Sequence, residues 1–170
     1  MARRPKSPNS NPAGGRSPRG ERFTIRTSAT DTAGRYSTIE IVAYPRNAVH
    51  LHVHSNEEEH FVVIEGRVHL TNGDQRLELS AGEAATVKRG TPHAWANLSD
   101  EPVRMLVMFA PGEQEKAFRL IGSATDGDFS AIAEENERLG TSVVGPPPYE
   151  NVYSVFAPRP VLAPEPDAAR

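Results

Sequence analysis

Short apolar stretches that alternate with polar residues recur throughout residues 23–111. Around Ile39 and Ile41, for example, apolar side chains occupy every second position. This period of two is typical of β-strands with one buried face, and turn residues separate successive stretches. Asn72-Gly73 predicts a tight type I′ hairpin, because both residues tolerate a positive φ. The pattern predicts an all-β fold, a sandwich or barrel of antiparallel strands, and not a parallel α/β sheet.

After Pro111 the pattern changes to a helical period. Residues 113–122 and 128–140 each place apolar side chains on one side of a short helix. In the second helix Asp128 is expected to be the N-cap and Gly140 the C-cap. Both helices are amphipathic, so we expect them to pack against the outside of the barrel or to cover its mouth.

The chain is divided by composition into four segments, within a length of 170 residues that suits one domain. The first is rich in Pro, Ser, Gly and Arg, carries six Lys or Arg residues against one Glu, and is expected to be disordered. The expected segments are a basic tail at 1–22, a barrel at 23–111, a helical extension at 112–145 and a Pro-rich segment at 146–170.

Composition and charge exclude several classes of protein. Cysteine is absent, which rules out disulfides, thiolate metal sites and thiol catalysis. The net charge is −3, to which residues 1–22 contribute +5 and the rest of the chain −8. The body is therefore acidic and is not expected to bind nucleic acid. No apolar run approaches the roughly 20 residues of a membrane helix, and no apolar signal segment is evident. We therefore expect no membrane partner and a cytoplasmic location.

The stretch HVHSNEEE at 52–59 carries candidate metal ligands. His52 and His54 are two residues apart, so on a strand both rings point to the same side of the sheet. A turn after them would return Glu59 on the neighbouring strand. Two nitrogens and one oxygen suit a borderline divalent metal better than Mg²⁺ or Ca²⁺. His93 is the best candidate for a fourth ligand, since it follows a clear turn into a new strand.

These residues resemble the two motifs of the cupin superfamily. His52, His54, Glu59 and Gly66 have the spacing H-x-H-x4-E-x6-G, and Gly82, Gly90, His93 and Asn97 fit most of G-x5-P-x-G-x2-H-x3-N. The chain departs from the motifs where Arg46 replaces the opening glycine of the first and Lys88 replaces the proline of the second. The resemblance implies an antiparallel double-stranded β-helix, a jelly-roll-like barrel, that holds one metal on three histidines and one glutamate. Motif spacing selects Glu59 and leaves Glu57 and Glu58 facing solvent.

Strand phase also suggests which residues surround the metal. His50 is in phase with the two motif histidines and is expected to support the ligands, although a position at the barrel rim explains it equally well. The other residues expected to line a cavity beside the metal are Phe61, Val63, Trp95, Asn97 and Met105. A mostly apolar cavity favours a planar or aromatic small molecule over a sugar phosphate.

The chain is similar to quercetin-dioxygenase-like cupins, and this resemblance implies a function. It implies a metal-dependent dioxygenase that acts on an enolisable aromatic or flavonol-like small molecule, with Glu59 also acting as a catalytic base. The divalent metal could be Fe, Mn, Ni, Co, Cu or Zn. Two alternatives stay open: a non-redox metal-dependent cyclase or isomerase, and a sensor that binds a small molecule without catalysis. An open strand edge favours a homodimer.

Overall fold

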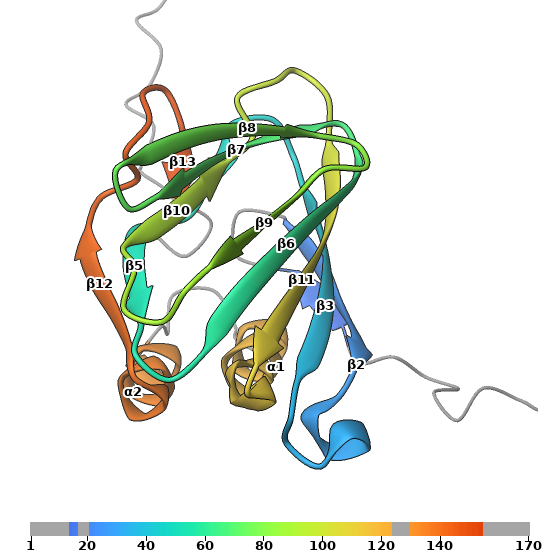
Figure 1. Cartoon of the computed structure of the whole chain (residues 1–170), viewed down its shortest axis with the longest axis vertical. Helices are drawn as coiled ribbons and strands as arrows, with labels where there is room; N and C mark the ends of the chain where they lie inside the picture. The colour runs from blue at the N-terminus through green and yellow to red at the C-terminus, as the bar shows by residue number, and fades with distance from the viewer. Residues whose placement is uncertain (1–13, 17–20, 124–129, 155–170) are drawn as a thin grey trace, which may run out of the picture.

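Two antiparallel β-sheets face each other in the computed structural model, which describes residues 14–16, 21–123 and 130–154 (Figure 1). The six-stranded sheet runs in the order β1 (Gly14–Arg16), β2 (Arg22–Thr27), β3 (Ser37–Ala43), β11 (Val103–Ala110), β6 (Glu58–Glu65), β9 (Ala84–Val87). The second sheet runs in the order β12 (Thr141–Gly145), β5 (Leu51–His54), β10 (His93–Ala96), β4 (Asn47–Ala48), β13 (Tyr153–Ser154), and β7 (Arg67–Asn72) joins β10 to β8 (Gln75–Ser80). The predicted all-β barrel is confirmed.

The core lies between the sheets, and the predicted alternation determines which residues enter it. On β3, Ile39 and Ile41 are buried, while Glu40 between them is only partly covered. The central strand β11 buries every second side chain from Val103 to Phe109. Among the described strands, every pairing is antiparallel except that of β13 with β4. The alternating pattern therefore placed these residues on the correct face of their strands.

Two local features near the strands differ from the sequence predictions. Residues 14–16, expected in a disordered tail, form β1 and pair with β2. The hairpin between β7 and β8 is present, but its loop is Gly73-Asp74 and only Gly73 has a positive φ, so the type I′ prediction is wrong.

Arg46 adopts the left-handed conformation (φ 66°) that the motif glycine would take without strain. Its guanidinium donates to the carbonyl of Leu98 and to Asp100, which holds the turn in place.

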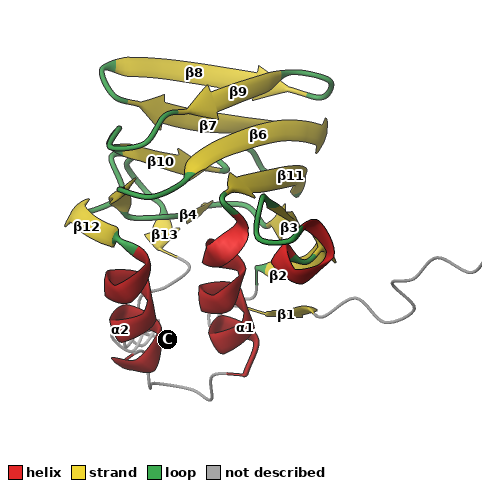
Figure 2. Ribbon diagram, turned by 60° about the horizontal axis from the view of Figure 1, so that its bottom comes forward, coloured by secondary structure: helices red, strands yellow, loops and turns green. Residues whose placement is uncertain are grey.

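Two helices cover one end of the barrel (Figure 2). A 3-10 turn at Gly112–Gln114 leads into α1 (Glu115–Ser123), and α2 (Ser130–Leu139) follows; a second 3-10 turn, at Ala29–Thr32, joins β2 to β3. Phe118 of α1 packs edge-on against Phe23 at 5.5 Å between ring centroids. Gly140 ends α2 with a φ of 82°, as expected of a C-cap, whereas Asp128 lies outside the described residues. None of the helices described is long and apolar enough to cross a membrane.

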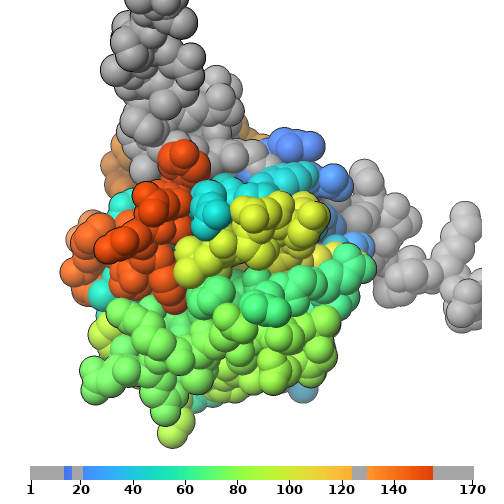
Figure 3. Space-filling model, turned by 90° about the horizontal axis from the view of Figure 1, so that it is seen from above, coloured from blue at the N-terminus to red at the C-terminus, as the bar shows by residue number. Residues whose placement is uncertain are grey.

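Residues 141–145, expected within a helical extension, form β12. This strand pairs with β5, so that Thr141 lies opposite His54 and Val143 opposite His52. In the space-filling view, the orange-to-red segment that contains β12 and β13 lies directly against the barrel (Figure 3). Both extension helices are thus joined to barrel strands, α1 after β11 and α2 before β12.

Candidate metal centre

The four predicted ligands meet between the two sheets. His52 and His54 extend from β5, and His93 begins β10 in register with His52. Glu59 comes from the opposite sheet, where it lies on β6 between Phe109 of β11 and Val87 of β9. The N–H of Gly90 donates to the carbonyl of His54 and so fixes the turn that precedes His93. Strand pairing within each sheet, and packing between the sheets, therefore position the site.

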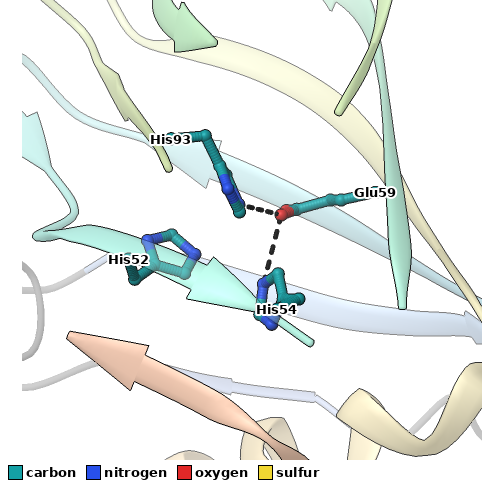
Figure 4. Close-up of side chains that lie close together, drawn as sticks. All are labelled: His52, His54, Glu59 and His93. Carbon is teal, nitrogen blue, oxygen red and sulfur yellow. Dashed lines mark hydrogen bonds and ion pairs between the residues drawn. The ribbon is translucent and has the colours of Figure 1, made fainter. Parts of the chain in front are cut away.

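The side chains converge closely enough to share one ion (Figure 4). One ligand atom from each of the four residues lies within 4.8 Å of the others. Oε2 of Glu59 is 2.7 Å from Nε2 of His93 and 3.3 Å from Nε2 of His54. The ring of His52 lies 4.2 Å from that of His93, measured between centroids. Three of the four residues are buried, and His52 is partly exposed, which leaves an approach from one side.

Each histidine is held at Nδ1, which turns Nε2 toward the centre. Nδ1 of His52 lies 2.8 Å from the carbonyl of His50, and Nδ1 of His93 lies 2.9 Å from the carbonyl of Thr91. A carbonyl only accepts, so both rings carry a proton on Nδ1, and Nε2 is the ring nitrogen that can offer a lone pair to a metal ion. Nδ1 of His54 is 2.8 Å from Oγ1 of Thr141. Three imidazole lone pairs and a carboxylate facing one point form a donor set that fits a divalent transition metal.

The pKa values in the cluster are shifted by burial and by the contacts among its members. Burial, which disfavours the charged imidazolium, and the positive charges of His93 and His54 lower the pKa of His52 to about 3. Burial alone would raise the pKa of Glu59, but hydrogen bonds from His54 and His93 outweigh it and hold that pKa well below its ordinary value. Burial opposes protonation of His93, yet Glu59 raises the pKa of His93. A proton shared by His93 and Glu59 thus supplies positive charge in a cluster whose donors suit a metal ion.

A cavity of about 390 Å³ opens beside the four residues. Barrel side chains such as Ile41, Trp95 and Phe109 form one wall, and residues of α1 and α2 form the other. The helices therefore cover the barrel mouth, one of the two positions expected for them. His50 lies in the cavity wall, and its Nδ1 lies 2.7 Å from Oγ of Ser154.

Several expected cavity residues lie elsewhere. Phe61, Val63 and Met105 point into the barrel core as predicted, but they are fully buried and do not line the cavity. Asn97 is also buried, and its amide donates to the carbonyls of Ala43 and Glu101, so that it braces a loop. Strand phase gives the face of a side chain but not its depth along the barrel, and these residues lie away from the open end.

Glu57 corrects another expectation. It was predicted to face solvent, but only 2% of its surface is exposed. Two residues apart on an extended chain, Glu57 and Glu59 share a side, which is the physical reason for the error. Burial raises the pKa of Glu57. Glu58, also predicted to face solvent, is partly covered, and its Oε2 lies 4.0 Å from Nε2 of His60.

Sequence reasoning missed four polar residues that line the cavity, namely Glu21, Gln114, Asn136 and Thr141. Thr141 lies 87 positions from His54, which it contacts. The β-branched residues in TSVVG favour a strand and could have predicted that residues 141–145 pair with the sheet. The approach of Gln114 and Asn136 depends on how the helices pack, which no local pattern reveals.

Comparison with known proteins agrees with this geometry. A family model described as "Cupin domain" matches residues 40–109, which include all four candidate ligands. Residues 40–109 form a cupin domain. Solved cupin-type structures share its fold: a predicted oxalate decarboxylase from Thermotoga maritima (TM-score 0.53, 17% identity, 59% of this chain and 92% of that one) and the polyketide cyclase RemF from Streptomyces resistomycificus (TM-score 0.52, 22% identity, 65% of this chain and 80% of that one).

One curated relative is similar to this chain in sequence. It is quercetin 2,3-dioxygenase from Bacillus subtilis (strain 168), which is 25% identical over 118 residues. The match covers 65% of this chain but 35% of the relative. The chain therefore spans about a third of the length of this relative.

Proposed function

We propose that the protein is a metal-dependent dioxygenase that acts on an enolisable aromatic small molecule of the flavonol type. The observation that carries this proposal is the convergence of three histidines and Glu59 beside a mostly apolar cavity, whose wall includes His52, His54 and Glu59. The cavity can enclose a planar ring system, and the ligand set faces into it. Similarity to a quercetin 2,3-dioxygenase supports this choice of substrate class.

In this proposal His52, His54, Glu59 and His93 hold one divalent metal. The metal would supply Lewis-acid charge to an enolate oxygen and, if redox-active, electrons to dioxygen. Glu59 accepts the enol proton, because one of its two carboxylate oxygens can leave the cluster and reach the substrate while the other stays. Trp95 and Phe109 hold the aromatic rings and exclude water.

The test is reconstitution with each of Fe²⁺, Mn²⁺, Ni²⁺, Co²⁺, Cu²⁺ and Zn²⁺, followed by measurement of oxygen uptake with quercetin. The proposal expects uptake that requires metal and disappears in Glu59→Gln and His93→Ala. A protein that binds no metal under these conditions would rule it out. Quercetin binding without turnover would instead identify a small-molecule-binding cupin.

A second candidate is a non-redox cyclase or isomerase. The specific observation in its favour is that Glu59, a carboxylate able to exchange a proton with an enolisable carbon, lies in the wall of the cavity, and such a reaction needs no oxygen. Turnover of an enolisable substrate under nitrogen would establish it. A homodimer and a cytoplasmic location remain predictions.

A further inference from the structure

A chain of hydrogen bonds runs from the metal centre to the far wall of the cavity. Nδ1 of His54 lies 2.8 Å from Oγ1 of Thr141. Oγ1 of Thr141 donates to Oε1 of Gln114 at 3.0 Å, and Nε2 of Gln114 donates to Oδ1 of Asn136 at 3.0 Å. Gln114 is buried, and all four residues line the cavity. The cupin barrel, the 3-10 turn that leads into α1, and α2 are therefore connected through polar atoms of four side chains.

The series of hydrogen bonds has a direction, because each hydroxyl or amide group that accepts a hydrogen bond from one neighbour donates one to the next. When Nε2 of His54 serves as a metal ligand, Nδ1 carries the proton and donates to Thr141. The Thr141 hydroxyl must then donate to Oε1 of Gln114, which leaves Nε2 of Gln114 to donate to Oδ1 of Asn136. This is the arrangement observed. The opposite direction would place the proton of His54 on Nε2 and prevent it from binding a metal.

The last member of the chain is left with an unused donor. With Oδ1 of Asn136 occupied by Gln114, its Nδ2 has no hydrogen-bond partner among the described residues. Asn136 is partly exposed and lies in the cavity wall, surrounded by apolar residues of the same helix, Ile132 and Ala133. A bound molecule would therefore meet an N–H donor at this wall.

We propose that Asn136 is a specificity-determining residue whose Nδ2 donates a hydrogen bond to an acceptor oxygen on the part of the substrate remote from the metal. This inference rests on the proposed function and narrows it to aromatic molecules that carry a carbonyl or similar acceptor on the distal ring. Thr141 and Gln114 are positioning residues. They connect the donor presented by Asn136 to the metal-binding tautomer of His54, so that metal occupancy favours acceptor-bearing ligands.

Direct binding to the Zn²⁺-loaded protein tests the donor. Trp95 is the single tryptophan of the chain and lines the cavity, so its fluorescence reports ligand binding. The probes are two 3-hydroxyflavones that carry, on the ring remote from the 3-hydroxy-4-oxo edge, either an acetyl group or an isopropyl group of the same shape without the acceptor. We expect the wild type to bind the acetyl compound about tenfold more tightly, as one hydrogen bond in a sheltered site allows.

Two substitutions then isolate the role of Asn136. Asn136→Leu removes the amide, and Asn136→Asp keeps an acceptor for Gln114 but offers no donor. Both variants should lose the tenfold preference while binding the isopropyl compound as the wild type does. Glu137→Ala, at an exposed position of the same helix, is the control and should retain the preference. Retention of the preference in both Asn136 variants, or no preference in the wild type, would overturn the proposal.

Side-chain NMR tests the connecting residues without any ligand. On addition of Zn²⁺, the side-chain amide resonances of Gln114 and Asn136 should shift in the wild type and in Thr141→Ser, which keeps the hydroxyl, but not in Thr141→Val. The Zn²⁺ dissociation constant should rise about tenfold in Thr141→Val and recover in Thr141→Ser. Equal shifts in all three proteins would refute the connection. If neither flavone binds to the wild type, the proposed substrate class fails, and these resonances still decide the role of Thr141.

Discussion

Nε2 of His93 lies 2.7 Å from Oε2 of Glu59, although the two residues are 34 positions apart and belong to different sheets. Neither sheet alone could form this contact. The pair joins the first residue of β10 to the second residue of β6 across the barrel interior, and His52 and His54 complete the cluster. The position of the candidate metal centre therefore depends on the packing of one sheet against the other.

Replacing His93 should remove most of the bound metal. Loss of an outer hydrogen-bond partner alone costs about 10- to 100-fold in metal affinity, so loss of a ligand in His93→Ala should cost at least about 100-fold. Metal content after dialysis, measured by inductively coupled plasma mass spectrometry, checks this. His60→Ala is the matched control, because His60 bonds to Thr86 outside the cluster and should keep full occupancy. Equal occupancy in both variants would contradict the ligand assignment.

Trp95 should affect ligand binding more than metal binding. It lines the cavity but belongs to neither the ligand set nor the hydrogen bonds that hold it. Trp95→Leu removes an aromatic face, so the affinity for a flavonol should fall by about tenfold while metal content is unchanged. Titration calorimetry measures the flavonol affinity, and the affinity of Trp95→Phe should lie between those of the wild type and Trp95→Leu. Metal loss in Trp95→Leu with unchanged flavonol affinity would mean that Trp95 supports the barrel and not the ligand.

Glu40 should make stability depend on pH. It lies between Arg26 and Arg104 on the outer face of the first sheet. The hydrogen bond from Arg104 lowers the pKa of Glu40, and Arg26 adds to this effect against partial burial. A carboxyl whose pKa is lower in the folded state stabilises the fold above its unfolded pKa, and this contribution is lost as the pH falls through the folded pKa.

The measurable consequence is a difference between two variants. Both arginines are partly exposed and screened by solvent, so Glu40→Gln should lower the free energy of unfolding by about 1 kcal/mol at pH 7, and by progressively less below about pH 4. Glu65→Gln removes a more exposed, 3.3 Å partner of Arg104 and should have almost no effect. Urea denaturation across this pH range checks both. A loss in Glu40→Gln that stays constant on acidification would exclude an ionic origin.

The outer edge of β12 should mediate a homodimer. This strand pairs with β5, no other described strand covers its far edge, and 53% of Val144 is exposed. A lysine there opposes edge pairing, so Val144→Lys should convert a dimer to a monomer in size-exclusion chromatography with light scattering. Val62→Lys places the same charge on β6, which is paired on both sides, and should leave the dimer intact. A monomeric wild type would disprove the prediction.

Local sequence was sufficient to predict which four residues converge but not what surrounds them. His52 and His54 could be predicted to share a side because strand geometry repeats every two residues, and the motif spacing then identified Glu59 and His93. The same rule placed Phe61 and Val63 on the correct face, yet it carries no information on depth along the barrel. Thr141 and Gln114 were missed because their contacts depend on β12 pairing with β5 after two intervening helices.

The attachment of the helices at both ends has a consequence for how the protein unfolds. α1 continues from β11, the central strand of one sheet, and α2 leads into β12, which pairs with the strand that carries His52 and His54. Pulling the helices away would break β12 from its neighbour and expose the apolar cavity wall. The C-terminal extension should therefore melt together with the barrel in one cooperative transition, and it cannot be exchanged as a separate module without disturbing the partner of His54.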